Sequence, residues 1–80
     1  MADNKPTHEI RFGRLRAAIW ENQTQDGNTL YNVTFSRLYK DGKNWKDSTS
    51  FGRDDMLLLA KLADAAHTWI LQEQNPDLAE

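Results

Sequence analysis

The chain has 80 residues, no cysteine and a formal net charge of −2, so it fits one small domain without disulfides or thiolate metal sites. Residues 1–53 carry nine Lys or Arg against six Asp or Glu, whereas residues 54–80 carry one Lys against six acidic residues. The two parts therefore sum to about +3 and about −5. Such a division predicts a cationic surface that suits a polyanionic partner better than the net charge suggests.

Residues 1–8 are polar, contain Pro6 and show no period, so we predict a flexible N-terminal arm. One domain then spans 9–74, and 75–80 form a C-terminal tail. The N-terminus lacks the apolar stretch of a signal peptide, and no run is long enough to cross a bilayer. We therefore expect a cytoplasmic, intracellular protein with no membrane partner.

The segment from Ile10 to Trp20 has strand character, but its apolar positions change parity at Gly13. A strand of period two cannot change faces without an extra residue, and a β-bulge would be tolerated at a glycine. The segment is either one bent strand or two strands that separate at Gly13. Beyond Gly13, Arg14, Arg16 and Trp20 share one face.

Two hairpin signals follow, Asp26-Gly27 and Asp41-Gly42. The stretch 30–39 between them alternates apolar and polar residues, and 45–51 forms a weaker strand. A break at Gly13 gives four strands, and consecutive hairpins predict an antiparallel meander.

The run MLLLAKLADAAHTWILQEQ predicts a helix that starts after Asp54 as its cap and ends before Asn75-Pro76. Its apolar arc covers roughly 200°, whereas a helix on a sheet needs a stripe only somewhat wider than about 100°. The surplus predicts a second subunit. The fold class is α+β, a four-stranded antiparallel β-meander followed by one C-terminal α-helix (ββββα) that dimerises through the helix. The expected dimer contacts are Leu59, Leu62, Ala66, Trp69 and Ile70.

The segments IRFGRLR and YNVTFSRLYKDG, with the terminal helix, resemble the positive-cofactor-four type of transcriptional coactivator. The resemblance covers about residues 9–73. It implies a ββββα fold, dimerisation largely through the helices, and binding of single-stranded DNA along the sheets. It also implies a role in support of transcription, replication or recombination.

Some family positions carry over to this chain. Gly13 with Arg14 and Arg16 matches the family's glycine and basic residues at the start of the sheet, and Tyr39 falls where the family has a base-stacking aromatic. Lys46 lies where a basic residue follows the second hairpin. Ser36 departs from the pattern, because the coactivator has a DNA-contacting arginine there.

Single strands bind through phosphate neutralisation and through stacking of bases on aromatic rings. Arginines and aromatics interleave in the predicted strands, so both terms are available here. We expect a partner of single-stranded DNA or RNA. The candidate nucleic-acid-binding residues are Arg14, Arg16, Trp20, Arg37, Tyr39, Lys43, Trp45 and Lys46.

Several of these candidate binding residues could instead have a purely structural role. Arg14 and Arg16 could belong to a solvated strand face, Trp20 to a core or dimer interface, and Trp45 to the cover of a sheet edge. The whole chain could be a protein-interaction module that dimerises without binding nucleic acid. We predict no enzyme, no cofactor, no metal and no small-molecule substrate, since His8 and His67 lack ligand spacing.

Overall fold

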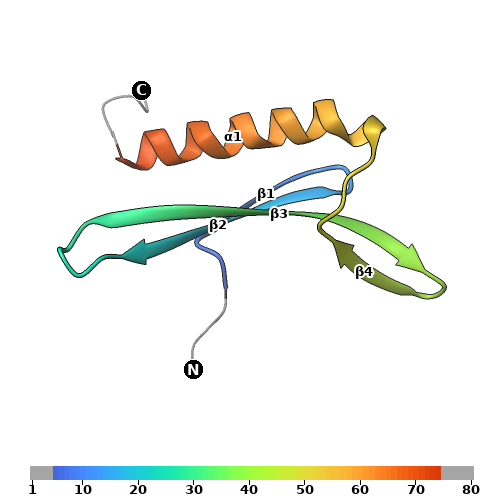
Figure 1. Cartoon of the computed structure of the whole chain (residues 1–80), viewed down its shortest axis with the longest axis horizontal. Coiled ribbons are helices and arrows are strands. Elements are labelled where there is room, and N and C mark those ends of the chain that lie inside the picture. The colour runs from blue at the N-terminus through green and yellow to red at the C-terminus, as the bar shows by residue number, and fades with distance from the viewer. Residues whose placement is uncertain (1–4, 75–80) are drawn as a thin grey trace.

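The computed structural model describes residues 5–74 and has one four-stranded sheet followed by a helix (Figure 1). The strands pair in chain order and are all antiparallel. The predicted ββββα arrangement is confirmed. The elements are β1 His8–Phe12, β2 Leu15–Gln23, β3 Thr29–Asp41, β4 Asn44–Ser48, the short 3-10 turn Arg53–Asp55, and α1 Met56–Gln74.

The change of parity at Gly13 arises from a hairpin turn rather than from a bulge. Phe12 pairs with Leu15, which leaves Gly13 and Arg14 as a two-residue turn. Gly13 has a φ of +61°, and a glycine with positive φ at the first turn position is typical of a type II′ hairpin. Because the chain reverses there, the apolar residues of both parities point to the same face of the sheet.

β3 is the longest strand and holds the sheet together. Its first part pairs with β2 as far as Arg37, and its last part, Arg37–Asp41, pairs with β4. The fourth strand ends at Ser48, so the predicted strand over 45–51 is too long at its C-terminal end. The β3–β4 hairpin diverges from the helix at one end of the molecule (Figure 1).

The core lies between α1 and one face of the sheet. Leu15, Ala17 and Ile19 of β2 meet Leu62 and Ala66 of α1, and all five are buried. Half-buried apolar residues complete the cluster; they are Ile10, Phe12, Tyr31, Val33, Phe35, Phe51, Leu59, Trp69 and Ile70. The opposite face of the sheet has no helix over it (Figure 1).

The start of the helix differs from the sequence expectation, which gave the capping role to Asp54. The Gly52 N–H donates to the Asp55 carboxylate at 2.9 Å, and the Asp55 N–H donates to the Gly52 carbonyl at 3.0 Å. Asp54 instead points into solvent and pairs with Arg53 at 3.6 Å. The carboxylate one residue later closes the turn, because the backbone enters through a 3-10 turn.

The predicted N-terminal arm is shorter than residues 1–8, because His8 already belongs to β1. The Thr7 N–H donates to the Ile19 carbonyl at 2.7 Å, and the His8 ring stacks on Trp69 of α1 with centroids 4.6 Å apart. The hydrogen bond joins the start of β1 to β2, and the ring stack joins β1 to the helix. The start of the arm (1–4) and the predicted tail (75–80) lie outside the described residues. Within the described part, no helix combines the length and apolarity needed to cross a membrane.

Candidate nucleic-acid interface

The predicted binding residues divide between the two faces of the sheet. Side chains alternate along a strand, so Arg16 and Trp20 of β2 lie opposite to the core residues Ala17 and Ile19. We call the helix-free side the open face. Cross-strand pairing places the following residues on it: Glu9, Arg11, Arg16, Trp20, Asn32, Thr34, Ser36, Leu38, Lys40, Trp45 and Asp47.

Trp20 is fixed in place on the open face. Its indole N–H donates to the Thr34 hydroxyl of β3 at 3.1 Å, and its side chain is half-buried. The hydrogen bond uses the polar edge of the ring and leaves the indole on the surface rather than in the core. A ring held this way has lost its rotamer freedom before any base arrives, which lowers the cost of stacking.

Arg16 shares the open face with Trp20, four residues away along β2, and reaches across β3. One of its terminal nitrogens is 3.9 Å from the Asp47 carboxylate of β4, and the Arg16 side chain keeps 35% of its exposed area. Its Nε is buried and has no hydrogen-bond partner within residues 5–74. The guanidinium is thus held by a single long contact, whereas an arginine–carboxylate pair at its strongest is short and bidentate. Sequence reasoning missed Asp47, which only the pairing of β3 with β4 brings near Arg16.

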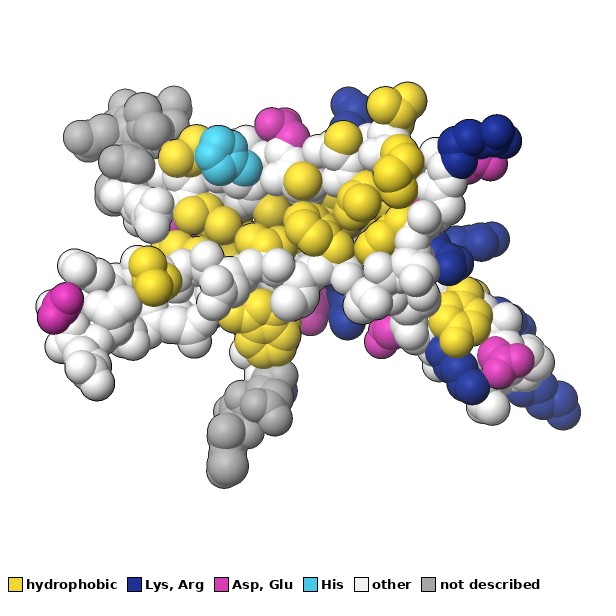
Figure 2. Space-filling model, in the orientation of Figure 1, with side chains coloured by type: hydrophobic (Ala, Val, Ile, Leu, Met, Phe, Trp, Pro, Cys, Tyr) yellow, Lys and Arg dark blue, Asp and Glu magenta, His cyan; other side chains and the backbone are white. Residues whose placement is uncertain are grey.

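A second aromatic with a basic neighbour occupies the hairpin end of the open face. The Lys40 ammonium lies 5.7 Å from the centroid of the Trp45 ring, and Trp45 is 64% exposed. Lys43 stands in the adjacent two-residue turn. Figure 2 shows Lys and Arg side chains gathered at this end of the molecule. The predicted combination of a ring with basic residues is therefore present here.

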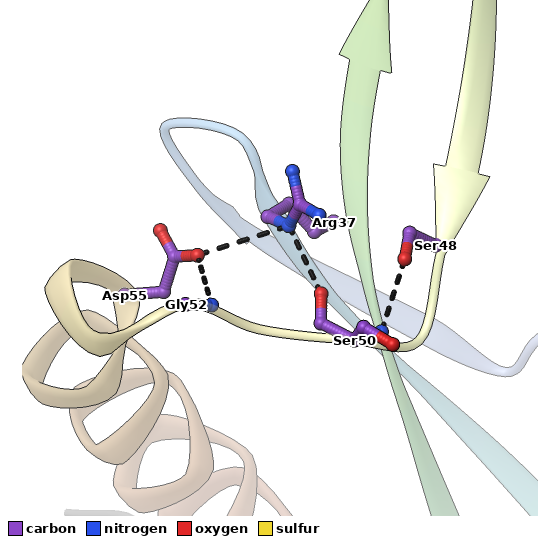
Figure 3. Close-up of polar contacts among 5 residues, drawn as sticks. All are labelled: Arg37, Ser48, Ser50, Gly52 and Asp55. Carbon is purple, nitrogen blue, oxygen red and sulfur yellow. Dashed lines mark hydrogen bonds and ion pairs between the residues drawn. The ribbon is translucent and has the colours of Figure 1, made fainter.

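Arg37 is used by the fold itself (Figure 3). Its Nε donates to the Ser50 carbonyl at 3.0 Å and lies 3.7 Å from the Asp55 carboxylate. The same carboxylate accepts the Gly52 N–H, so Arg37 joins β3 to the segment that enters α1. The guanidinium is on the helix side of the sheet, opposite to Arg16.

Tyr39 and Lys46 also lie on the helix side, since they pair with each other and alternate with Lys40 and Trp45. The Arg37 guanidinium lies 5.8 Å from the Tyr39 ring centroid. The Lys46 ammonium pairs with Asp41 at 3.0 Å. The structure therefore brings Arg16, Trp20 and Trp45 to one face, and does not bring Arg37, Tyr39 and Lys46 to that face.

Arg14 is exposed in the β1–β2 turn and belongs to neither face. Its carbonyl accepts the Leu38 N–H at 2.8 Å, which anchors the turn against β3 near the end of β4. Because Leu38 also pairs with Asp47 of β4, the β1–β2 turn lies close to the Arg16–Asp47 ion pair. Arg14 is placed at the border of the open face.

The residues predicted as dimer contacts mainly face the sheet of their own chain. Leu62 and Ala66 are buried in the core, and Leu59, Trp69 and Ile70 are half-buried against it. Other apolar residues of α1 are exposed to solvent; they are Met56, Leu57, Leu58, Ala60, Ala63 and Leu71. The predicted surplus of apolar surface is thus present, but on different residues.

Tyr31 is the described residue whose ionisation is clearly perturbed. Burial of its hydroxyl raises the pKa of Tyr31, and the nearby carboxylates of Glu21 and Glu73 raise it further. The ring also meets Trp69 edge-on with centroids 5.9 Å apart. Residues 5–74 contain no cluster of three or more metal-ligating side chains and no enclosed pocket.

Comparison with protein-family models, with curated proteins and with solved structures finds no match. The resemblance to the positive-cofactor-four family therefore stays a prediction made from short sequence motifs. Any function has to be argued from the residues of the sheet and the helix.

Proposed function

We propose that this protein is a homodimer that binds single-stranded nucleic acid, with DNA as the expected ligand, along the open face of its sheet. The observation that carries the proposal is the presence of two aromatic rings and of basic side chains on one uncovered face of the sheet. Trp20 and Arg16 lie four residues apart on the same side of β2, and the Lys40 ammonium lies 5.7 Å from the centroid of the Trp45 ring. A role in support of transcription, replication or recombination would follow from the family resemblance alone.

The spacing of the Trp20 and Trp45 rings suits an extended single strand of nucleic acid. Trp20 is level with Asn32 of β3, and Trp45 is level with Lys40 of the same strand. Eight residues of strand correspond to about 26 Å at about 3.3 Å per residue. A strand of several nucleotides lying along β3 could stack bases at both ends and place phosphates near Arg11 and Arg16 between them.

Two physical terms supply the affinity. Stacking on an aromatic ring contributes about 1–3 kcal/mol per base and tolerates any sequence. Phosphate neutralisation gives binding that weakens as salt increases, in proportion to the number of contacts. The open face offers few groups aimed at base edges, so we expect little sequence preference.

Fluorescence anisotropy of a labelled oligo-dT at low and high salt tests the proposal. We expect Arg16→Ala to weaken binding by about tenfold, as the loss of one charge-assisted phosphate contact implies. Lys61→Ala is the matched control, because it removes one positive charge from the exposed side of α1. Equal affinity of Arg16→Ala and wild type, or binding that is insensitive to salt, would count against the open face.

A protein-interaction module without nucleic-acid binding is the second candidate. The observation that favours it is the exposure of apolar residues at the start of α1, where Leu57 is 84% exposed and Met56 is 45% exposed. Exposed apolar surface of this kind marks an interaction site. Lack of oligo-dT binding at low salt, together with a stable oligomer, would favour this candidate.

A further inference from the structure

β3 has a long edge that no other strand covers. β2 lies along one edge of β3 from Thr29 to Arg37. On the other edge, β4 pairs with Arg37–Asp41 only. Within the described residues, 29–36 therefore have no strand partner on the side where β4 lies.

The backbone groups of this edge point outward in a regular row. The Leu38 N–H donates to the Arg14 carbonyl, so even-numbered residues of β3 point their backbone groups toward β2. Successive residues of a strand alternate in this direction. The N–H and C=O groups of Tyr31, Val33 and Phe35 therefore point to the uncovered edge. They form a template for one more antiparallel strand.

The sequence of this edge lacks the usual protection against pairing. Proteins shield exposed edges with charged residues, proline or bulges. The edge TLYNVTFS contains no charge, no proline and no glycine. The other edge strands do carry charges, Glu9 and Arg11 in β1, and Lys46 and Asp47 in β4. The uncharged edge is thus confined to the first part of β3.

An exposed apolar stripe of α1 faces the same side of the molecule. Leu58 lies beside Gly13 of the β1–β2 turn and marks the β1 side of the helix, whereas Trp69 sits between His8 of β1 and Tyr31 of β3. At about 100° per residue, Met56 and Ala63 lie roughly opposite to Leu58, which is the β3 side. We call Met56, Ala60 and Ala63 the helix flank. Figure 2 shows hydrophobic side chains exposed along the seam between α1 and the sheet.

We propose that a second copy of this chain pairs with the uncovered edge of β3, antiparallel and about a two-fold axis. The inference rests on the homodimer of the proposed function and specifies how it is built. An isologous contact uses the same patch on both subunits, and an uncharged edge can meet its own copy without like-charge repulsion. The two helix flanks then lie side by side over one eight-stranded sheet.

This arrangement has a consequence for the ligand. The two open faces become one continuous surface, because both helices lie on the other side of the joined sheet. The Trp20 and Trp45 sites of the two subunits then line a single surface rather than two separate ones. A longer oligonucleotide can contact both subunits at once, which raises its apparent affinity over a short one.

Spin-label distances measure the arrangement directly. The chain has no cysteine, so Asn32→Cys on β3 and Glu9→Cys on β1 each give one labelled site per subunit. Both positions are exposed on the open face. At about 4.8 Å between strands, β3 lies about 5 Å from its mate, whereas the two β1 strands lie about 24 Å apart. We expect a short label distance for Asn32→Cys and a clearly longer one for Glu9→Cys.

Ala63→Glu provides an independent readout by sedimentation. A carboxylate on the helix flank should dissociate the dimer, whereas Thr68→Glu, on the solvent side of α1, should leave it intact. A monomeric wild type at tens of micromolar, or a short distance for Glu9→Cys and a long one for Asn32→Cys, would overturn the inference. Pairing of the uncovered β3 edge with a strand of a different protein, instead of a second copy of this chain, would also overturn the inference. Each of these results could occur while oligo-dT still binds in an Arg16-dependent way, so the binding function is tested separately.

Discussion

The Arg16 guanidinium lies 3.9 Å from the Asp47 carboxylate, and the contact crosses β3 between Ser36 and Leu38. An exposed ion pair of this kind contributes at most about 1 kcal/mol. Asp47 is therefore a weak competitor for any phosphate that approaches Arg16. We predict that Asp47→Asn tightens oligo-dT binding about two- to five-fold, measured by anisotropy at low salt.

The control for this prediction separates a local effect from a change in net charge. Asp26→Asn removes the same charge in the β2–β3 loop, beyond the end of β2, which is itself about 23 Å along the strand from Arg16 and so more than two Debye lengths away at about 0.1 M salt. In an Arg16→Ala background, Asp47→Asn should have no more effect than Asp26→Asn. Equal tightening by Asp47→Asn in both backgrounds would show that Asp47 acts through the overall charge.

Substitution of Arg37 is predicted to lower the stability of the fold, whereas substitution of Arg16 is predicted to weaken oligo-dT binding. Arg37 donates to the Ser50 carbonyl and pairs with Asp55, so Arg37→Ala should lower the free energy of unfolding by about 1–2 kcal/mol. Arg16→Ala should change it by less than about 0.5 kcal/mol, because its single contact is long and exposed. Urea unfolding measures both variants. If the Arg37→Ala variant is as stable as wild type but loses oligo-dT binding, Arg37 contributes to nucleic-acid binding rather than to the fold.

Gly13 is predicted to be required for its backbone conformation. Its φ of +61° is costly for any residue with a Cβ, and Gly13→Ala should lower the free energy of unfolding by about 1–2 kcal/mol. An added Cβ would lie 3.7 Å from a Leu58 methyl, which is an ordinary contact, so crowding adds little.

Gly52→Ala is the matched control for Gly13→Ala. Gly52 has a φ of −85°, and an added Cβ would lie 3.6 Å from the Asp55 carboxylate. Alanine adopts this conformation freely, so the variant should be as stable as wild type or more stable by up to about 1 kcal/mol. Similar losses in the two variants would contradict a hairpin turn that depends on positive φ at Gly13.

Tyr31 is predicted to make stability fall at high pH. Burial and the carboxylates of Glu21 and Glu73 raise the pKa of Tyr31 in the folded chain. The folded state then keeps its proton where the unfolded state has lost it, so stability is full below the ordinary tyrosine pKa of about 10 and declines as pH rises through the folded value.

Thermal unfolding at about pH 8 and about pH 11 measures this dependence. Tyr31→Phe has no hydroxyl to ionise, so the variant should lose less stability between the two pH values than wild type. An identical loss in both proteins would assign the alkaline transition to other groups.

Much of the fold could be predicted from the sequence, because its signals are local. The alternation in β3, the two Asp-Gly turns and the run of helix formers each specify one element without long-range information. Gly13 correctly indicated where the strand is interrupted, but the sequence suggested a β-bulge there, whereas the structure has a hairpin turn. Parity alone does not distinguish a bulge from a hairpin, since both change the face on which the next residues lie.

The site was harder to predict, because it depends on which residues share a face across strands. Arg37 and Tyr39 are adjacent in sequence to open-face residues, yet alternation places them on the helix side. Asp47 meets Arg16 only through the register of β3 with β4. The helix residues Leu62 and Ala66 were expected at a dimer contact, but the sheet of the same chain covers them.

The most direct test of the open face uses the three tryptophan indole N–H groups as reporters in a proton–nitrogen correlation spectrum. Trp20 and Trp45 lie on the open face, whereas Trp69 is half-buried on the other side of the sheet, packed against the core. On titration with oligo-dT, we predict shifts of the Trp20 and Trp45 indole signals and of the Arg16 and Lys40 amides, with Trp69 little changed. Shifts confined to Trp69 and the helix, or an unchanged spectrum at low salt, would contradict binding along the open face.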